Sequence, residues 1–420
     1  MTVVESFMLA TSSDNALPYE AALLRNLPGR VEQLLLAACL GEGEGAARAW
    51  RDFAAAVGDP KGYFEADQSG LKGLLPLVGA SLMRNRIDAG KVFQTYARVA
   101  LVREELRGRI CGEILSSVLE ALNAAGIATV LLKGTALSAT VYPQPSARHN
   151  HAIDLLVDDA QMDGADEVLK ALQFAACPRS AGAASHQDYR HWTGLALGLH
   201  TRPFYLPNFE MPRDEILARA HSVRIRSTTV RVMSPEHSLV HICGHATYSR
   251  SRTNLRWACD AFYLLQRNPG LEWQLIVRSA EDARVALQLY VLLRWLKASL
   301  DVSIPEAALA QLRDRSRGLD FVAAEGILAS LVHTQMSWAR ALECCRGERR
   351  MVLNFLKFGA LPSPRYLRWR YNSDRNWRLP LYYLRRPVQF GMNFARRQLL
   401  RVGRLDVAGF NLLAKEDVAR

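Results

Sequence analysis

The stretch that decides the fold spans residues 130–159 and reads VLLKGTALSATVYPQPSARHNHAIDLLVDD. Short apolar runs at residues 128–132 and 153–157 are typical of strands that are buried in a sheet. Between them, residues 136–141 have the composition of a short helix. A strand, a helix and a second strand in close succession predict part of a small α/β core.

The rest of this core follows directly. We expect Asp159 to cap a helix after the second strand. A further strand is predicted at residues 195–199, and residues 223–232 alternate in the manner of a hairpin. The core therefore extends over residues 126–233.

Helical segments flank the core on both sides. Residues 1–125 are predicted to be helical throughout, with the clearest helix at 101–125, ended by Gly126. After the core, Ser234-Pro235-Glu236 has the form of a helix start. It opens a helical segment at 234–345 with helices at 255–267, 273–284, 285–300 and 306–315. The sequence predicts a mostly helical protein with an α/β (α+β) core, followed by a basic, aromatic-rich region at 346–420.

The charge of the chain is concentrated at its end. The 53 Lys and Arg and 41 Asp and Glu of the 420 residues give a net charge of +12. The 81 residues from Arg340 onward hold 18 basic and 6 acidic side chains, so the remainder is neutral overall. Three interpretations of the basic region stay open: packing on the helical body, contact with an anionic membrane or partner, and nucleic-acid binding.

The seven cysteines show no CxxC spacing, so we expect neither a disulfide framework nor a zinc site. No signal peptide or membrane-spanning segment is recognisable, and we expect a soluble protein in the cytoplasm.

Lys133-Gly134-Thr135 is the first candidate for chemistry. A strand that leads through these residues into a helix presents backbone N–H groups, a hydroxyl and a cation, which suit a phosphate. The alternative is an ordinary turn, for which glycine is equally common.

Four motifs of the opening stretch stand in a recognisable order. They are Lys133-Gly134, Tyr142-Pro143, Arg148 and the run from Ile153 to Val157. This order resembles that of the uncharacterised nucleotidyltransferase families of the DNA-polymerase-β-like superfamily. The resemblance continues through His200, Ser234-Pro235-Glu236, His241, His245, Arg256-Trp257 and Asp260.

The resemblance implies a nucleotidyltransferase core with a small mixed sheet, and transfer of a nucleotidyl group from an NTP to an unidentified protein or small molecule. Such transfer uses two Mg²⁺ or Mn²⁺ ions held by converging carboxylates. By motif, Asp154 would bind the metal and act in catalysis with Lys133. The phosphates would bind to Lys133, Gly134, Thr135 and Arg148, with His200, His245, Arg256 and Asp260 in support.

The chain departs from the family pattern at the metal. Ala152 stands where the first of two Asp residues is expected, and Gly198 stands where a third acid is expected, so only Asp154 is left. One carboxylate cannot hold two Mg²⁺ ions. We expect transfer to be impaired or lost, unless an acid elsewhere compensates or the substitutions were introduced. The alternative is a non-catalytic nucleotide-binding or scaffold protein that contacts a partner, an anionic membrane or nucleic acid through 346–420.

Three further features have plain structural interpretations. His237, His241 and His245 share one helix face and could suggest a metal site, but packing is favoured. Arg256 and Asp260 are one turn apart and suggest an ion pair on a helix surface. Arg148 is either solvated in its loop or directed at a phosphate.

Overall fold

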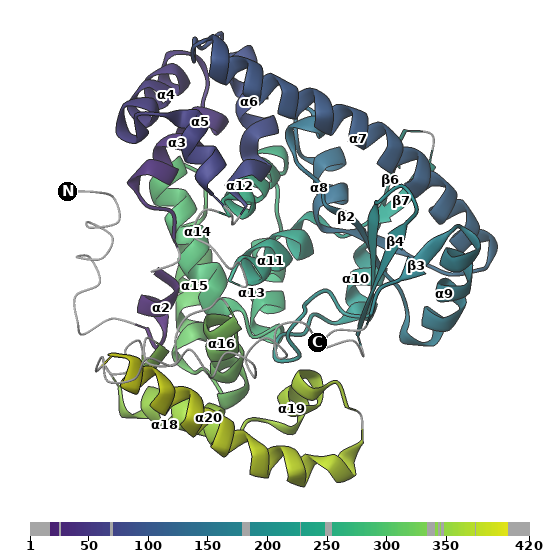
Figure 1. Ribbon diagram of the computed structural model, residues 1–420, viewed down its shortest axis with the longest axis vertical. Coiled ribbons are helices and arrows are strands. Elements are labelled where there is room, and N and C mark those ends of the chain that lie inside the picture. The colour runs from purple at the N-terminus through teal and green to yellow at the C-terminus, as the bar shows by residue number, and fades with distance from the viewer. Residues whose placement is uncertain are drawn as a thin grey trace.

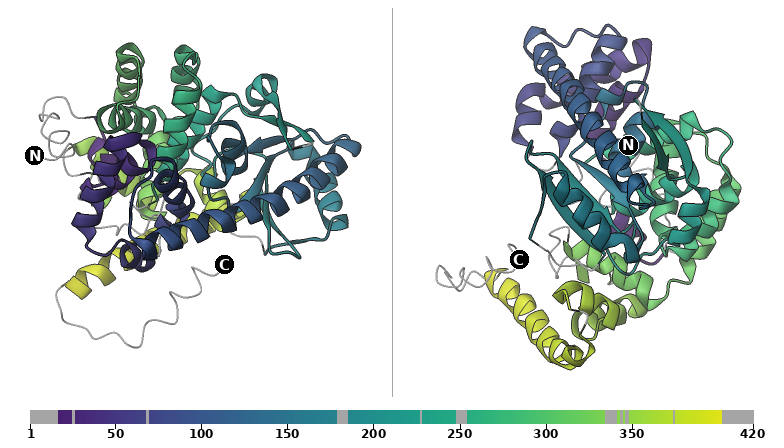
Figure 2. Two further views of the ribbon diagram at one scale, coloured as in Figure 1. Left: turned by 90° about the horizontal axis from the view of Figure 1, so that it is seen from above. Right: turned by 90° about the vertical axis from the view of Figure 1, so that its right-hand side faces the viewer.

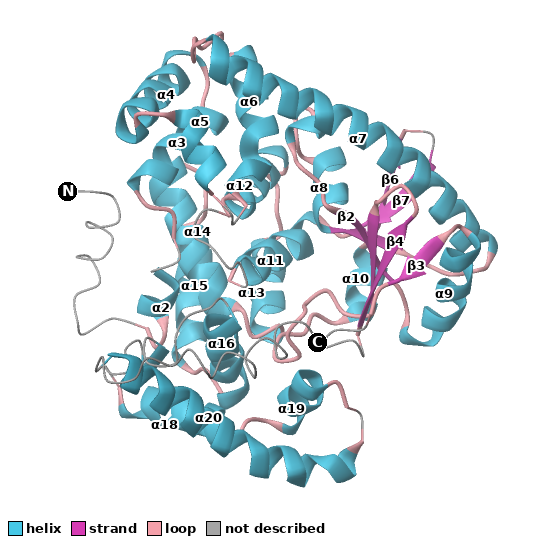
Figure 3. Ribbon diagram, viewed as in Figure 1, coloured by secondary structure: helices cyan, strands magenta, loops and turns pink. Residues whose placement is uncertain are grey.

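The computed structural model describes residues 17–401, except for 25–26, 68–69, 179–184, 227, 248–253, 334–340, 343–344, 346–347 and 374. The sheet lies at one end of the molecule and helices make up the remainder (Figure 3). The protein is thus mostly helical with a mixed sheet, as the sequence predicts.

Seven strands form a single sheet. They are β1 (Val130–Leu132), β2 (Ala152–Leu156), β3 (Phe174–Ala176), β4 (His186–His191), β5 (Ala196–His200), β6 (His221–Ile225) and β7 (Thr228–Val232). Their order is β3-β4-β5-β2-β1-β7-β6. The pairs β2–β5 and β1–β7 are parallel and the other neighbours are antiparallel.

The two faces of the sheet have different environments. One face carries Leu131, Ile153 and Leu197, which belong to an apolar cluster with α7 (Lys91–Ala124) and α9 (Met162–Ala171). Figure 1 shows α7 running from the N-terminal helices to the sheet. The opposite face carries Val130 and Leu132, which belong to the core of the helical body. Because side chains alternate along a strand, Asp154 and His200 lie on the face toward the helical body.

Helices of the first and last parts of the chain form that body. Before the sheet come α2 (Glu20–Leu24), α3 (Arg30–Leu40), α4 (Gly43–Val57), α5 (Pro60–Ala66) and α6 (Leu75–Arg84). Within the core lie α8 (Lys133–Thr140) and α10 (Arg213–Arg219). After it come α11 (Pro235–Ala246), α12 (Arg256–Arg267), α13 (Trp273–Asp282), α14 (Ala286–Leu300), α15 (Glu306–Arg317), α16 (Phe321–His333), α18 (Arg349–Ala360), α19 (Pro364–Tyr371) and α20 (Leu379–Arg401).

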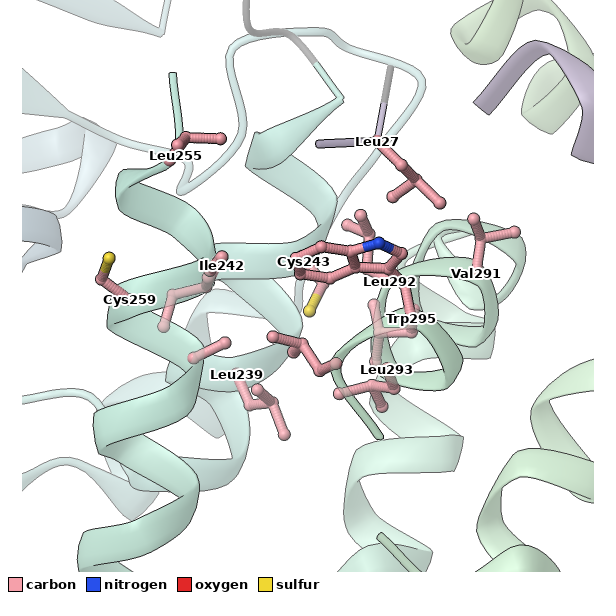
Figure 4. Packing of buried hydrophobic residues seen from close by; sticks show 14 of the residues in the cluster. Leu27, Leu239, Ile242, Cys243, Leu255, Cys259, Val291, Leu292, Leu293 and Trp295 are labelled. Atoms are coloured by element: carbon pink, nitrogen blue, oxygen red, sulfur yellow. The ribbon is translucent and has the colours of Figure 1, made fainter. Parts of the chain in front are cut away.

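The centre of this body is an apolar core. Trp295 of α14 is fully buried, and Cys243 of α11 and Cys259 of α12 belong to the same cluster (Figure 4). The cluster contains residues of helices that precede the strands in the sequence and of helices that follow them.

The division of the chain into segments 1–125, 126–233, 234–345 and 346–420 stays a prediction.

Most elements agree with the sequence. The segment 101–125 is the second part of a longer helix, α7, and Ser234 caps α11 by accepting from the His237 N–H. The strands expected at 153–157 and 195–199 are present within one residue, and β6 and β7 form the hairpin.

Four details differ. Strands β3 and β4 were not expected, because His186–His191 contains few residues that favour strands. The strand expected from residue 128 begins at Val130. Lys133 begins α8 with a φ of 52°, so the helix starts three residues before the expected range. The cap after β2 is Asp158 rather than Asp159, since the Asp158 carboxylate accepts from the Ala160 N–H.

None of the described helices combines the length and hydrophobicity that a membrane crossing requires. The described cysteines Cys39, Cys111, Cys177, Cys243 and Cys259 are free thiols.

Candidate active site

Three neighbouring strands place the candidate residues in two rows. Asp154 of β2 is in register with Gly198 of β5, and Gly198 is in register with Asp188 of β4. Two residues further along β5, His200 is in register with His186 of β4. Because residues directly opposite one another on paired strands point to the same face, all of these positions share the face toward the helical body.

Asp154 lies at the centre of a compact polar cluster. Lys133 Nζ donates to Asp154 Oδ1 at 2.8 Å, and His200 Nε2 donates to the same oxygen at 2.7 Å. The two donors are themselves 3.3 Å apart. Lys133 reaches Asp154 because the left-handed backbone at this residue turns the chain sharply from β1 into α8.

The charges of this cluster follow from its geometry. Burial by itself would raise the pKa of Asp154, but Lys133 and the hydrogen bond from His200 outweigh it and hold the pKa well below the ordinary value. Burial and the nearby Lys133 lower the pKa of His200 to about 4. At neutral pH the cluster is therefore an ammonium–carboxylate pair with a neutral imidazole beside it.

His186 and Asp188 extend the cluster onto β4. His186 Nδ1 is 3.0 Å from His200 Nδ1, and His186 Nε2 is 2.8 Å from Asp188 Oδ1. The hydrogen bond from His186 lowers the pKa of Asp188. The two imidazole rings thus connect the Asp154 carboxylate to the Asp188 carboxylate.

Gly198 is the residue that admits this chain of hydrogen bonds. A Cβ at this position would lie 2.9 Å from His200 Nε2, 3.1 Å from His186 Cε1 and 3.2 Å from Asp154 Oδ1. These separations are shorter than ordinary van der Waals contact. The room that the expected third acid would need is filled by the two imidazole rings.

The residues present do not fit a two-magnesium centre. Among the residues that the structure describes, no three His, Cys, Asp or Glu side chains are placed to hold a metal ion together. Oδ1 of Asp154 already accepts from an ammonium group, which is where a cation would bind. Ala152, at the other expected acid position, is in register with Ala196, so two methyl groups stand there. We derive no step through a metal ion.

The residues Lys133-Gly134-Thr135 form the start of α8. Its N-terminus has no side-chain cap, so no side-chain acceptor neutralises its first backbone N–H groups. Thr135 Oγ1 is committed to the Ala152 carbonyl at 3.1 Å, so its hydroxyl fastens α8 to β2. Gly134 is required because a Cβ there would collide with Arg148 and Asn150.

Arg148 is held inside the protein rather than solvated. Its Nε and Nη2 donate to the two carboxylate oxygens of Asp260, each at 2.8 Å, and Tyr142 Oη donates to Asp260 Oδ1 at 2.7 Å. The expected surface pair between Arg256 and Asp260 is therefore wrong, since Asp260 is buried and faces the loop before β2. The paired carboxylate raises the pKa of Arg148 although burial opposes it.

The same loop is fixed from the other side by α7. The buried Glu104 carboxylate accepts from His149 Nδ1 at 2.6 Å and from the Asn150 N–H at 2.8 Å. Loop 148–151 is thus tied to both α7 and α12. Local sequence patterns did not indicate this role of Glu104.

Arg256 differs from Arg148 in having no acidic partner among the described residues. Its Nε donates to Asn254 Oδ1 at 3.3 Å, and no described carboxylate forms an ion pair with it. Burial and the nearby Arg148 lower its pKa. A partly buried guanidinium in this setting favours an anion.

The three histidines of α11 have separate roles. His237 bonds to Ser234, and His241 Nε2 lies 3.0 Å from the Pro203 carbonyl. Solvent reaches the ring of His245, although protein surrounds it, and burial together with Lys133 lowers its pKa well below the ordinary value. Because His245 interacts electrostatically with Lys133, Asp154 and His200, α11 lies beside the same cluster.

A family model described as uncharacterised nucleotidyltransferase matches residues 68–301, more than half of the chain. The chain belongs to this family. The matched range contains every candidate residue discussed above.

A solved structure, an antigenic nucleotidyltransferase-like protein from Paracoccidioides brasiliensis, is similar at 16% identity. The match covers 47% of this chain and 96% of that chain, with a TM-score of 0.31. No curated protein matches the chain.

Two residues of the cluster, His186 and Asp188, were missed by sequence reasoning. The available signal was weak: they alternate with Gln187 and Tyr189, which are buried. A search for polar residues at alternate positions of an unassigned segment could have found them.

Proposed function

We propose that this member of the nucleotidyltransferase family binds a nucleotide beside Lys133 but does not carry out metal-dependent nucleotidyl transfer. The observation that carries the proposal is the contact of Lys133 Nζ and His200 Nε2 with a single oxygen of Asp154. In a two-metal mechanism that oxygen would bind a divalent cation. Here an ammonium group provides the positive charge permanently.

Anion binding is supported by groups on α8 and α12. The N-terminus of α8 has no side-chain cap, and Arg256 has no carboxylate partner among the described residues. Both favour negative charge. Lys133, the first residue of α8, keeps about a quarter of its side chain exposed. Phosphate groups of a nucleotide would then bind to the α8 N-terminus, Arg256 or Lys133, and no metal ion would be needed to neutralise their charge.

Calorimetric titration of the full-length protein with ATP tests this proposal. We expect binding of similar affinity in excess Mg²⁺ and in EDTA, and no labelled product when radiolabelled NTPs, Mg²⁺ or Mn²⁺ and a cell lysate are supplied. Arg256→Gln should weaken ATP binding about tenfold, because a charge-assisted hydrogen bond contributes roughly 1.5–3 kcal/mol. Lys91→Met, which removes an exposed cation at the start of α7, serves as the matched control.

Three results would contradict the proposal. They are the absence of ATP binding, binding that requires Mg²⁺, and equal loss of affinity in the Arg256 and Lys91 variants. A labelled product would show that transfer persists.

Residual transfer is the second candidate, because Asp188 supplies a carboxylate near the missing acid. It lies across Gly198 from Asp154, two strand spacings or about 9.6 Å away along the sheet. His186 and His200 occupy the space between the two acids. If transfer is detected, Asp188→Asn should abolish it; transfer that survives this change would exclude Asp188 as the replacement acid.

A further inference from the structure

The last helices of the chain carry an apolar stripe that no described part of the protein covers. On α20, Leu381, Leu384, Val388 and Met392 are 56%, 72%, 58% and 59% exposed. Their spacing of three and four residues places them on one side of the helix. Figure 2 shows α20, in yellow, along the outside of the molecule.

The opposite side of α20 holds it to the body. The Phe390 ring packs against Phe355 of α18 with centroids 5.7 Å apart, and Tyr383 Oη donates to the Pro362 carbonyl at 3.0 Å. The helix is therefore docked through one side while the apolar stripe faces outward. Packing on the body explains the inner residues but leaves the stripe without an explanation.

The charge around the stripe has one sign. Residues 349–401 contain thirteen Lys and Arg and one Asp, and α20 itself contains no acidic residue. Arg375, Arg378 and Arg385 pair with no carboxylate among the described residues, although Arg385 lies over the Tyr371 ring. Arginines without a carboxylate partner suit a negatively charged surface, and the exposed aliphatic side chains beside them suit an apolar layer below that surface.

A second exposed stripe, on α7, lacks this charge pattern. Val99 and Leu106 are 58% and 53% exposed, but Glu105 and Arg109 form an ion pair beside them. Mixed charge gives no preference for an anionic surface. Of the two stripes, only that of α20 combines exposed aliphatic residues with charge of one sign.

We propose that α20 lies against an anionic lipid membrane, with the stripe from Leu381 to Met392 inserted at the headgroup boundary and the arginines contacting lipid phosphates. Trp377, which is 64% exposed just before the helix, suits the same interface. Nucleic acid would need aromatic side chains along the stripe for base stacking, and the stripe is aliphatic. A second copy pairing through α20 would bring arginines against arginines.

Flotation of the full-length protein with vesicles tests the proposal. We expect binding to vesicles of phosphatidylcholine mixed with phosphatidylserine, weak binding to phosphatidylcholine alone, and release by salt. Leu384→Asp should weaken binding at least about tenfold, since it removes an inserted leucine and adds a negative charge. Arg385→Glu should weaken it about fivefold or more. Both residues are exposed, so circular dichroism should show an unchanged fold.

Leu106→Asp on α7 makes the same change to another exposed leucine, and we expect it to alter binding less than twofold. Equal binding to neutral and anionic vesicles, or equal effects of the Leu384 and Leu106 variants, would overturn the proposal. So would tighter binding to a single-stranded oligonucleotide than to anionic vesicles. Dimers in light scattering that Leu384→Asp dissociates would assign the stripe to a second copy instead.

Discussion

The substitution Gly198→Ala tests whether the two imidazole rings hold fixed positions at Asp154. The added Cβ would fall 2.9 Å from His200 Nε2, about 0.5 Å inside ordinary contact. The ring must withdraw by about that distance. The hydrogen bond to Asp154 would then lengthen from 2.7 Å to about 3.2 Å, beyond the range of strong charge-assisted bonds.

The cost of this shift has two parts. Overpacking a well-packed site typically costs 1–3 kcal/mol. A hydrogen bond to a charged group contributes about 1.5–3 kcal/mol, of which the longer bond keeps a part. We expect the free energy of unfolding to fall by about 2 kcal/mol. Glutamate has the same Cβ, so Ala152→Asp combined with Gly198→Glu should not restore nucleotidyl transfer.

Urea unfolding followed by circular dichroism measures the effect, with Gly270→Ala as the control. A Cβ at Gly270 meets nothing within 4 Å, so this variant should stay within about 0.5 kcal/mol of the parent protein. If Gly198→Ala is as stable as the Gly270 variant, the rings yield easily and the argument from space fails. Labelled product from the double variant would refute the same argument through activity.

Three further outcomes follow from the contacts. Asp260→Asn should lower the free energy of unfolding by about 3–5 kcal/mol in urea, because it leaves the buried Arg148 guanidinium without a counter-ion. In the folded protein, His200 and His241 have pKa values lowered to about 4. Between pH 6.5 and 4, these two rings are therefore protonated in the unfolded chain but remain neutral in the folded protein. Stability should therefore fall with falling pH in this window by about 1.4 kcal/mol per unit for each ring, and His241→Asn should reduce the slope. Mg²⁺ should leave the melting temperature of the protein unchanged in a thermal scan, whereas a shift to higher temperature would reveal a cation site.

The sequence predicted the elements whose pattern is local. The apolar runs at 128–132 and 153–157, the Ser234 cap and the period of α7 each depend on neighbouring residues, and the structure contains all of them with small shifts. The partners of Arg148 could not be predicted in this way. Asp260 is 112 residues distant, and only the packing of α12 against the loop before β2 brings the two side chains together.

The cluster at Asp154 shows a second limit. Its outer members His186 and Asp188 lie on a strand whose existence depends on pairing with β5, since its own residues favour a strand only weakly. The effect of Gly198 was likewise visible in the sequence only as a missing acid. In the structure, the His186 and His200 rings can contact each other only because Gly198 has no Cβ.

The residues that carry the family resemblance therefore separate into two groups with different physical roles. Tyr142, Arg148 and Asp260 form a buried network that fixes loop 148–151 against α12, and this network does not depend on a metal ion. The second group comprises positions 152 and 198, where the resemblance leads us to expect acids and where the side chains are a methyl group and a hydrogen atom. None of the hydrogen bonds of the first group involves these two positions. The buried network can therefore form whether or not positions 152 and 198 carry acids.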